Sequence, residues 1–340
     1  MLIRSKAPLR IGLAGGGTDV SPYSDLFGGA ILNSTISLFA HATIEPLNNG
    51  KIIFEAADRS EIISMDSALE LPIDGQLSIH KGIYNHVVKN HVKKPLSFRL
   101  TTHVDAPAGS GLGTSSTLAV SILGAFSEWL QLPLGEYDIA HLAYRIERIE
   151  LNMAGGKQDQ YAATFGGVNF MEFFADDLVI VNPLRIKQDY LNELEHNLLL
   201  YYTSTSRDSS VIIEQQRLNV EKKDMDSIEA THNLKEQAIQ MKAALLKGQI
   251  DAIGEILDYG FRNKKKMASG ISNQWMDELY DEARKAGASG GKISGAGGGG
   301  FMIFYCPGVT RSKVISALEH TGGNFVHYSF TKTGLTSWII

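Results

Sequence analysis

A glycine-rich segment in the first third of the chain, DAPAGSGLGTSSTLAV at 105–120, constrains the fold more than any other. It follows the strand-like run LSFRLTTHV and leads into an apolar run with helical spacing, which predicts a loop between a strand and a helix. Alternating glycines let backbone N–H groups turn inward, and a helix N-terminus adds unpaired N–H groups with a partial positive charge. The segment therefore predicts a phosphate-binding loop. The alternative is a tight turn whose Ser and Thr side chains only cap the helix.

Two common phosphate-binding patterns do not describe the glycine-rich segments. A Walker A loop needs G-x-x-x-x-G-K-[ST], whereas AGASGGKI has Ala286 at the first glycine position and Ile293 after the lysine. A dinucleotide-binding loop needs G-x-G-x-x-G between a strand and a helix, and Thr114 replaces the last glycine of the first loop. The glycines of 295–300 fit that spacing, but they lead into the strand-like run FMIFYC, the reverse of the required order. These contexts disfavour a nicotinamide-dependent enzyme, which stays an alternative.

The glycines are gathered rather than spread along the chain. They make up 34 of 340 residues, above the usual ~7%, and they cluster at 14–19, 109–113, 155–156 with 166–167, and 287–300. Such clusters indicate backbone conformations closed to other residues, or a close approach of the backbone to another group. We expect a ligand that is surrounded by backbone.

Charge and hydropathy exclude several classes of protein. The formal net charge is -5, which argues against nucleic acid as the main partner but not against a local cationic pocket. No apolar run approaches the ~18 residues of a membrane span, and the N-terminus lacks the apolar core of a signal peptide. The single cysteine, Cys306, allows no intrachain disulfide, which fits a reducing compartment. We expect a cytoplasmic protein with a small-molecule partner.

The order of predicted elements indicates a two-domain α+β protein, as the length of 340 residues also suggests at ~150 residues per domain. Helical spacing recurs at 114–130 and 134–151, and 208–285 is almost wholly helical in pattern. We place the domains at 1–190 and 191–340. The strand-like runs are KIIFEA, LSFRLTTHV, GGVNFMEFF, NLLLYYT and FMIFYC.

Three segments, KAPLRIGLAGGGTD, PAGSGLGTSS and GGKISGAGGGG, occur in this order and resemble the GHMP small-molecule kinases, which include galactokinase, homoserine kinase and mevalonate kinase. The resemblance implies an N-terminal α/β domain, a ferredoxin-like C-terminal domain, and ATP with Mg²⁺ in the cleft between them. It also implies which residues cradle the nucleotide phosphates. They are Pro107, Ala108, Gly109, Ser110, Gly111, Leu112, Gly113, Thr114, Ser115 and Ser116.

A fourth segment, AYRIERIELNMAGGKQDQYAATFGG at 143–167, resembles the part of these kinases that carries a magnesium-binding Glu and an Asp near the substrate hydroxyl. Glu147 and Asp159 match those places, and Glu150 is a rival for the metal because it neighbours Glu147 on a helix. Ser115 matches the hydroxyl that reaches Mg²⁺, an ion that prefers hard oxygen ligands. Arg10 stands where relatives carry Lys or Arg, and a cation there stabilises charge on the transferred group. From the residues alone, Asp159 could equally be a turn or cap residue, and Arg10 a structural one.

The segment GGGTD resembles the branch of sugar kinases that acts on D-glycero-D-manno-heptose 7-phosphate, and is also close to the L-fucose kinases. Galactokinases have a Glu and a His before the Thr-Asp pair, and the glycines found here leave space for a larger or anionic substrate. In YYTSTSRDSS, Arg207 predicts an anion clamp, with a hydroxyl-rich helix start as the alternative. The run NKKKM at 263–267 is either a cationic rim or, as we expect, a solvated helix face. The proposed substrate-binding residues are Gly16, Gly17, Thr18, Asp19, Gly156, Arg207, Gly297 and Gly298.

Together these features predict a sugar kinase that transfers the γ-phosphoryl group of ATP to a heptose phosphate. The resemblance points to O1 of D-glycero-D-manno-heptose 7-phosphate, with the 1,7-bisphosphate as product. The alternatives are a kinase of the same family for L-fucose, galactose or another unphosphorylated sugar, and a non-catalytic protein that binds a nucleotide or sugar. We expect neither nucleic acid nor a membrane as partner.

Overall fold

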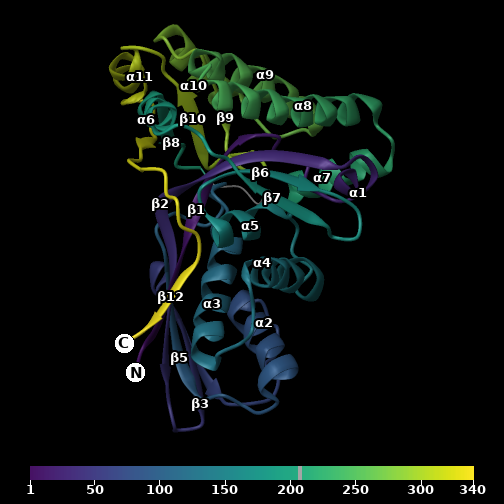
Figure 1. Cartoon of the computed structure of the whole chain (residues 1–340), viewed down its shortest axis with the longest axis vertical. Coiled ribbons are helices and arrows are strands. Elements are labelled where there is room, and N and C mark those ends of the chain that lie inside the picture. The colour runs from purple at the N-terminus through teal and green to yellow at the C-terminus, as the bar shows by residue number, and fades with distance from the viewer. Residues whose placement is uncertain (206–208) are drawn as a thin grey trace.

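The computed structural model describes residues 1–205 and 209–340, and two sheets organise them (Figure 1). Within those residues, the first sheet has eight strands. They are β1 (Ile3–Ala14), β2 (Gly29–Pro46), β3 (Lys51–Ala56), β4 (Glu61–Asp66), β5 (Phe98–Val104), β6 (Val168–Phe173), β7 (Val179–Pro183) and β12 (Thr336–Ile339). Six of them follow the order β12-β1-β2-β5-β3-β4, while β6 pairs with the start of β2 and with β7. Every pair is antiparallel except β3 with β5.

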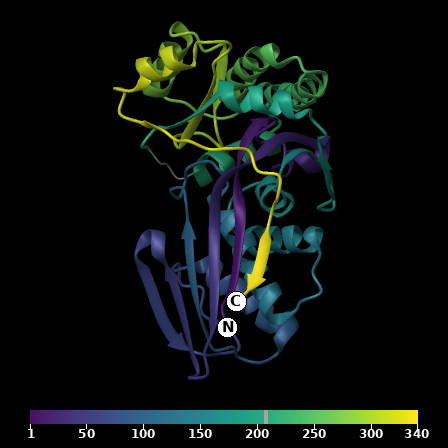
Figure 2. The ribbon, with the colours of Figure 1, turned by 60° about the vertical axis from the view of Figure 1, so that its left-hand side comes forward.

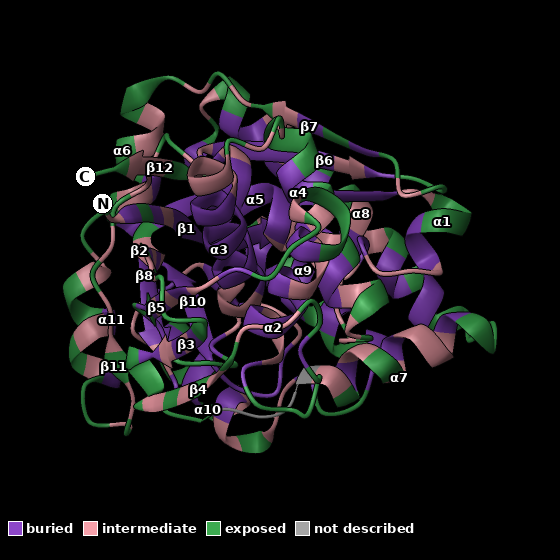
Figure 3. Ribbon diagram, turned by 90° about the horizontal axis from the view of Figure 1, so that it is seen from below, coloured by how far each residue is buried: buried purple, intermediate pink, exposed green. Residues whose placement is uncertain are grey.

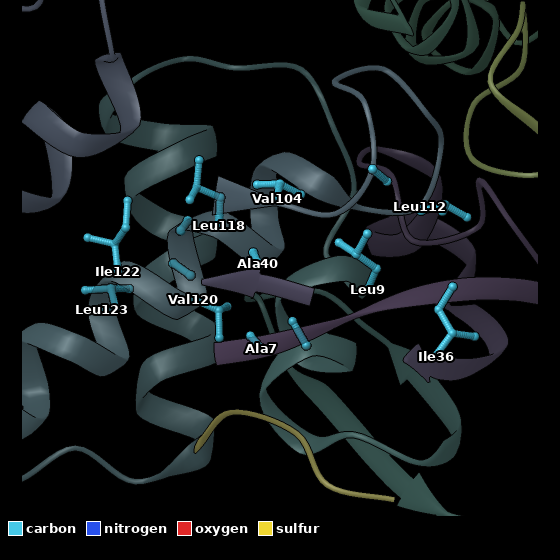
Figure 4. Close-up of a cluster of buried hydrophobic side chains, with 14 of the residues drawn as sticks. Ala7, Leu9, Ile36, Ala40, Val104, Leu112, Leu118, Val120, Ile122 and Leu123 are labelled. Carbon is cyan, nitrogen blue, oxygen red and sulfur yellow. The ribbon is translucent and has the colours of Figure 1, made fainter. Parts of the chain in front are cut away.

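The helix α3 (Thr114–Leu130) lies at the centre of the first domain and confirms the helix predicted for 114–130. Every residue from Ser116 to Phe126 is buried, because this helix is apolar on nearly all sides. In Figure 3, α3 is accordingly coloured mostly as buried. Figure 4 shows Leu118 and Ile122 of α3 in one buried cluster with Ala7 of β1 and Ala40 of β2. This packing fixes the helix start, and with it the preceding glycine loop, against the end of β5.

Shorter helices cover the rest of the first sheet. They are α1 (Tyr23–Phe27), α2 (Ser78–Val87), α4 (Glu136–Arg145) and α5 (Gln158–Phe165). The helix predicted for 134–151 is α4 continued by a π-helical turn, η3 (Ile146–Glu150), in which Leu151 N donates to Ile146 O at 2.9 Å. A π-turn inside a helical segment is rare and often marks a functional site.

The second sheet has the order β11-β8-β10-β9 and is antiparallel throughout. Its strands are β8 (Leu198–Tyr202), β9 (Gly290–Ile293), β10 (Phe301–Tyr305) and β11 (Asn324–Phe325). The helices of this half are α6 (Gln188–Asn197), α7 (Ser209–Glu221), α8 (Met225–Lys247), α9 (Ile253–Met267), α10 (Gln274–Lys285) and α11 (Arg311–Leu318). Four of them, α7 to α10, lie in the stretch predicted to be helical, and the α+β architecture is confirmed.

The two halves are joined by more than the chain connection. The helix α8 packs against both β1 and β2, and Gly15 N donates to Gln237 of α8 at 3.2 Å. The last strand, β12, returns to the first sheet and pairs with β1, so that the two termini lie side by side (Figures 1 and 2). The predicted second domain, 191–340, thus includes one strand of the first sheet. No helix in the ranges 1–205 and 209–340 is both long and apolar enough to span a bilayer.

Candidate active site

A cleft of about 450 Å³ opens where loops of the two halves meet. Its walls come from the end of β1, the loop before α3, the segment between η3 and α5, the helices α7 and α9, and the loop between β9 and β10. It brings together most residues proposed from the sequence. Those that line it are Arg10, Gly17, Asp19, Gly109, Gly111, Gly113, Thr114, Ser115, Ser116, Gly156, Asp159 and Gly297.

The predicted phosphate loop runs from β5 to α3, as expected, and its three glycines adopt a backbone conformation that disfavours other residues. Gly109, Gly111 and Gly113 have φ angles of 73°, 79° and 81°. The helix starts at Thr114 with no side chain capping it, which argues against the capping alternative. Between the glycines, Ser110 and Leu112 are buried, while Pro107 and Ala108 before them are exposed. The N-terminal N–H groups of α3 therefore face the cleft with glycine backbone around them.

The glycine loop near the C-terminus packs directly on the phosphate loop. A Cβ atom on Gly111 would lie 2.5 Å from Ser294 O, and one on Gly295 would lie 2.6 Å from the Cα of Gly111. Gly300 likewise has no room beside Ser110 O, and Gly298 donates its N–H to Ile271 O at 2.8 Å. Part of the glycine excess thus serves contact between two backbone segments, rather than contact with a ligand as we expected.

Arg10 and Asp159 form a close ion pair beside the loop. Arg10 Nε and Nη2 lie 2.7 Å and 2.6 Å from Asp159 Oδ1, and Nη1 donates to Gly111 O at 2.6 Å. Arg10 is 4% exposed, whereas the side chain of Asp159 keeps 21% exposure toward the cleft. The guanidinium fork thus fixes one oxygen of the carboxylate relative to the phosphate loop.

Asp19 anchors the helix that carries Asp159. Its Oδ2 accepts hydrogen bonds from Lys157 N at 2.9 Å and Gln158 N at 3.0 Å, at the start of α5. Burial raises the pKa of the Asp19 carboxyl, although the bond from Gln158 N opposes this. A Cβ atom on Gly156 would lie 1.9 Å from Asp19 Oδ2, so only glycine fits there. The cap of α5 therefore comes from Asp19, and Asp159 is left for Arg10 and the cleft.

The side chain of Thr18 stabilises the turn that follows β1. Its Oγ1 donates to Gly15 O at 2.8 Å or Ala30 O at 2.9 Å and accepts from Ala30 N at 3.0 Å. The side chain is fully buried. These bonds hold the turn that presents Asp19.

Glu147 and Glu150 point in different directions. Glu147 is fully buried, and its Oε1 accepts from Ser115 Oγ at 3.0 Å while its Oε2 accepts from Gln160 Nε2 at 2.6 Å. Glu150 is 34% exposed and lies 2.9 Å from His86 Nδ1. The π-turn explains the difference, because residues three apart on it are rotated further from each other than on an α-helix. The geometry favours Glu147 over Glu150 at the phosphate loop.

The pair of Ser115 and Glu147 fits a magnesium ion. A hydroxyl and a carboxylate oxygen 3.0 Å apart lie beside the phosphate loop, and both are hard oxygen ligands. Among the described residues, no three His, Cys, Asp or Glu side chains gather into a metal site. Mg²⁺ bound with a nucleotide needs fewer protein ligands, because phosphates and waters complete its shell.

Two buried lysines near the cleft are not among the site residues proposed from the sequence. Lys264 of α9 is 1% exposed, lines the cleft, and donates to Gly16 O at 3.1 Å. Lys292 of β9 is 3% exposed and donates to Gly12 O at 2.8 Å. No carboxylate pairs with either ammonium group in the part of the chain that the structure describes. Burial lowers the pKa of Lys264 from its usual value near 10.5 to about 8, and lowers that of Lys292 well below 10.5.

The prediction of a solvated face for the run NKKKM is wrong at Lys264, although Lys265 and Lys266 are exposed. The helical periodicity of this segment indicates that Lys264 is buried. The residues Ile253, Leu257, Phe261 and Met267 form the buried stripe of α9, and Lys264 falls on the same stripe.

The space beside Gly16 and Gly17 is filled by α9. A Cβ atom on Gly16 would lie 3.4 Å from Lys264 Nζ, and one on Gly17, whose φ is 103°, would lie 2.8 Å from Met267 Cε. The glycines therefore make room for two side chains of the protein, where we expected room for the substrate. Arg207, the predicted anion clamp, lies outside the described residues.

A second cavity of about 380 Å³ adjoins the phosphate loop and shares Gly109, Thr114 and Ser115 with the cleft. Apolar side chains such as Leu118 line it together with His80. Burial lowers the pKa of His80 to about 3, and its Nε2 is 2.9 Å from Thr102 Oγ1. This cavity was not predicted from the sequence, because its walls come from segments far apart in the chain. A mostly apolar cavity with few polar groups is typical of a site for a nucleobase or a similar small molecule.

The chain is similar to known proteins in both of its halves. The models described as GHMP kinases N terminal domain and GHMP kinases C terminal match residues 78–167 and 241–324. The chain is 48% identical over 338 residues to a D-glycero-alpha-D-manno-heptose 7-phosphate kinase of Campylobacter jejuni, covering 99% of both chains. It is 46% identical, with a TM-score of 0.86 and 99% of both chains covered, to a crystal structure of a D-glycero-D-manno-heptose 1-phosphate kinase from Bacteroides thetaiotaomicron. Galactokinase from Lactococcus lactis, at 17% identity and a TM-score of 0.78 over 98% of this chain and 95% of its own, shares the fold.

We expect Lys264→Met to raise the free energy of unfolding of the ligand-free protein by roughly 3 kcal/mol at pH 7, since the folded state no longer buries an ammonium group. A pKa lowered from near 10.5 to about 8 corresponds to this cost at about 1.4 kcal/mol per pKa unit. Between pH 8 and 10.5 the unfolded wild type holds more protons than the folded one, so its stability rises with pH and the advantage of the variant shrinks. Urea unfolding at pH 7 and pH 9.5 measures both effects.

The exposed neighbour offers a matched control. Lys266→Met should change stability by no more than about 0.5 kcal/mol at either pH, as surface substitutions usually do. If Lys264→Met destabilised the protein at both pH values, the buried ammonium group would be a net stabilising element, and the cost assigned to its burial would be wrong.

Proposed function

The chain belongs to the GHMP kinase family, and we propose that it transfers the γ-phosphoryl group of ATP to O1 of D-glycero-α-D-manno-heptose 7-phosphate. The choice of sugar rests on the relative in Campylobacter jejuni. That protein is named a D-glycero-alpha-D-manno-heptose 7-phosphate kinase, and the chain shares 48% identity with it over 99% of its length. The product would be the 1,7-bisphosphate. One observation carries the reaction class: the Arg10–Asp159 pair is bonded directly to the phosphate loop at Gly111.

The nucleotide would lie across the phosphate loop. Its phosphates fit the N–H groups at the start of α3, where the helix dipole and the inward-facing backbone favour anions. Its nucleoside fits the mostly apolar second cavity, which Leu118 and His80 line. In this pose the terminal phosphate points into the 450 Å³ cleft, toward Asp159.

Ser115 and Glu147 would hold the magnesium ion that accompanies ATP. When bound, the ion neutralises part of the charge on the phosphates. Gln160 and Arg148 keep the carboxylate of Glu147 in place, since Gln160 Nε2 donates to it at 2.6 Å and Arg148 Nη1 lies 3.6 Å from it.

Asp159 and Arg10 would act on the acceptor hydroxyl. As the sugar oxygen forms its bond to the γ-phosphorus, the bond from that phosphorus to the β–γ bridging oxygen breaks and ADP leaves. The proton of the hydroxyl passes to the carboxylate of Asp159, which lies at the cleft surface. Arg10 holds this carboxylate in position and adds positive charge next to the transferred group.

A sugar panel tests the proposed substrate. With ATP and Mg²⁺, kcat/KM for the heptose 7-phosphate should exceed that for the unphosphorylated heptose, L-fucose and galactose by about 100-fold or more, because an enzyme discriminates by contacts to groups the poorer substrate lacks. Coupled ADP assays give the rates, and phosphorus NMR identifies the position of the new phosphate. Equal rates with and without the 7-phosphate would contradict the substrate, and a new phosphate on another oxygen would contradict O1.

Asp159→Asn should lower kcat by about 10²- to 10⁴-fold, because the amide accepts no proton and loses the ion pair with Arg10. The exposed Asp176 provides the control, since Asp176→Asn lies outside the cleft and should leave kcat unchanged. Turnover of Asp159→Asn near the wild-type rate would remove Asp159 from the mechanism. A wild-type protein that binds ATP but turns over none of the sugars would favour the non-catalytic alternative.

Glu147→Gln and Glu150→Gln form a matched pair. We expect Glu147→Gln to raise the Mg²⁺ concentration for half-maximal activity by about 10-fold or more, because an amide is a weaker ligand than a carboxylate. Glu150→Gln should stay within about twofold of the wild type, since Glu150 pairs with His86 outside the cleft. Magnesium titrations at saturating ATP measure both, and the reverse order of effects would assign the metal to Glu150.

A further inference from the structure

One part of the cleft is built from α7, α9 and the turn at Gly16 and Gly17, and no step of the proposed phosphoryl transfer uses it. Lys264 comes from α9 and Gln216 from α7, and both line the cleft. Both side chains lie beside the glycine turn, since Lys264 Nζ contacts Gly16 and Gln216 Oε1 lies 3.5 Å from the Cβ position of Gly17.

Lys264 presents an ammonium group that is not neutralised by the protein. It has three N–H donors, and one of them bonds to Gly16 O at 3.1 Å. Asp19 is the acidic residue whose charge acts on it, and Arg10 opposes that effect from nearby. Because a buried charge is normally paired, an unpaired one at a cleft surface indicates a place for an anion.

Gln216 supplies a second unused donor. Its side chain is 5% exposed, and in the ranges 1–205 and 209–340 its Nε2 has no hydrogen-bond partner. A buried amide without a partner costs about 1–3 kcal/mol, so such groups are rare unless a ligand or water completes them. An acceptor that reaches both Lys264 and Gln216 would satisfy the two groups at once.

We propose that Lys264 and Gln216 bind the phosphate group that the sugar already carries. A phosphate monoester offers the acceptor oxygens and negative charge that an ammonium group and an amide N–H both require. The phosphate on C7 lies at the opposite end of the heptose from O1, so it needs a site separate from the loop that holds ATP. This inference rests on the proposed function and adds the residues that select a phosphorylated sugar. It does not depend on Arg207.

The rival explanation is structural. Lys264 could serve only to tie α9 to the turn at Gly16, and Gln216 only to fill space beside Gly17. In that case the two side chains would affect all substrates alike, because the turn also carries Asp19 and supports α5. The preference for a phosphorylated over an unphosphorylated sugar therefore separates the two explanations.

The experiment compares D-glycero-D-manno-heptose 7-phosphate with the unphosphorylated heptose as substrates of the wild type, Lys264→Met, Gln216→Leu and Lys266→Met. The quantity measured is the ratio of kcat/KM for the two sugars. We expect Lys264→Met to lower this ratio by about 30-fold or more and Gln216→Leu by about 5- to 10-fold, in line with the loss of a charged and of a neutral hydrogen bond. The exposed control Lys266→Met should leave the ratio unchanged.

Each outcome decides something different. A wild type with no preference for the phosphorylated sugar would overturn the proposed substrate itself. A wild type with that preference, and variants that keep it, would overturn only the phosphate site. An equal loss of activity on both sugars would assign Lys264 a structural role and overturn the site as well. Gln216→Leu tests the same site from another helix, so the result does not depend on the folding of one variant.

Discussion

The contact on which the rest of the site depends is the buried guanidinium of Arg10. It joins the strand β1, the phosphate loop and the helix α5, because its three nitrogens reach Asp159 Oδ1 and Gly111 O. The backbone reinforces this, since Arg10 N donates to Leu112 O at 3.1 Å. The carboxylate, the loop and the strand are therefore placed relative to one another by one rigid group, as a reaction that depends on positioning requires.

Glycine makes this arrangement possible in two distinct ways. In the phosphate loop it allows positive φ angles at Gly109, Gly111 and Gly113. Between the halves of the protein it allows backbone to touch backbone, as where Gly295 packs on Gly111. The second use lets the glycine loop between β9 and β10 pack on the phosphate loop without side chains between them. A side chain at Gly111 or Gly295 would push the two loops apart, because its Cβ would overlap backbone atoms of the other loop.

Features that follow from local sequence pattern were predicted, whereas features that depend on how distant segments of the chain pack together were not. The strand, loop and helix around 105–120 follow from glycine spacing and apolar period, and the structure agrees. Glu147 was preferred to Glu150 on the resemblance, whereas the π-turn that turns the two side chains apart was not predicted from local pattern. Lys264 was taken for part of a solvated run, since burial of a single lysine depends on how α9 lies against the turn at Gly16. The cavity with His80 combines distant segments, so no local pattern marked it.

The cationic side chains of the site differ in whether a carboxylate compensates them. This difference links the stability of the ligand-free protein to the binding of an anionic ligand. Arg10 is compensated by Asp159, whereas the buried Lys264 and Lys292 have no carboxylate partner among the described residues. Burial lowers the pKa of each lysine, and for Lys264 this means that the ligand-free protein bears a cost for keeping an ammonium group at the cleft. An anionic ligand removes part of that cost when it binds, so the folded state is stabilised more by a phosphorylated sugar than contact area alone would suggest. The same uncompensated charge that weakens the empty protein thereby selects the substrate.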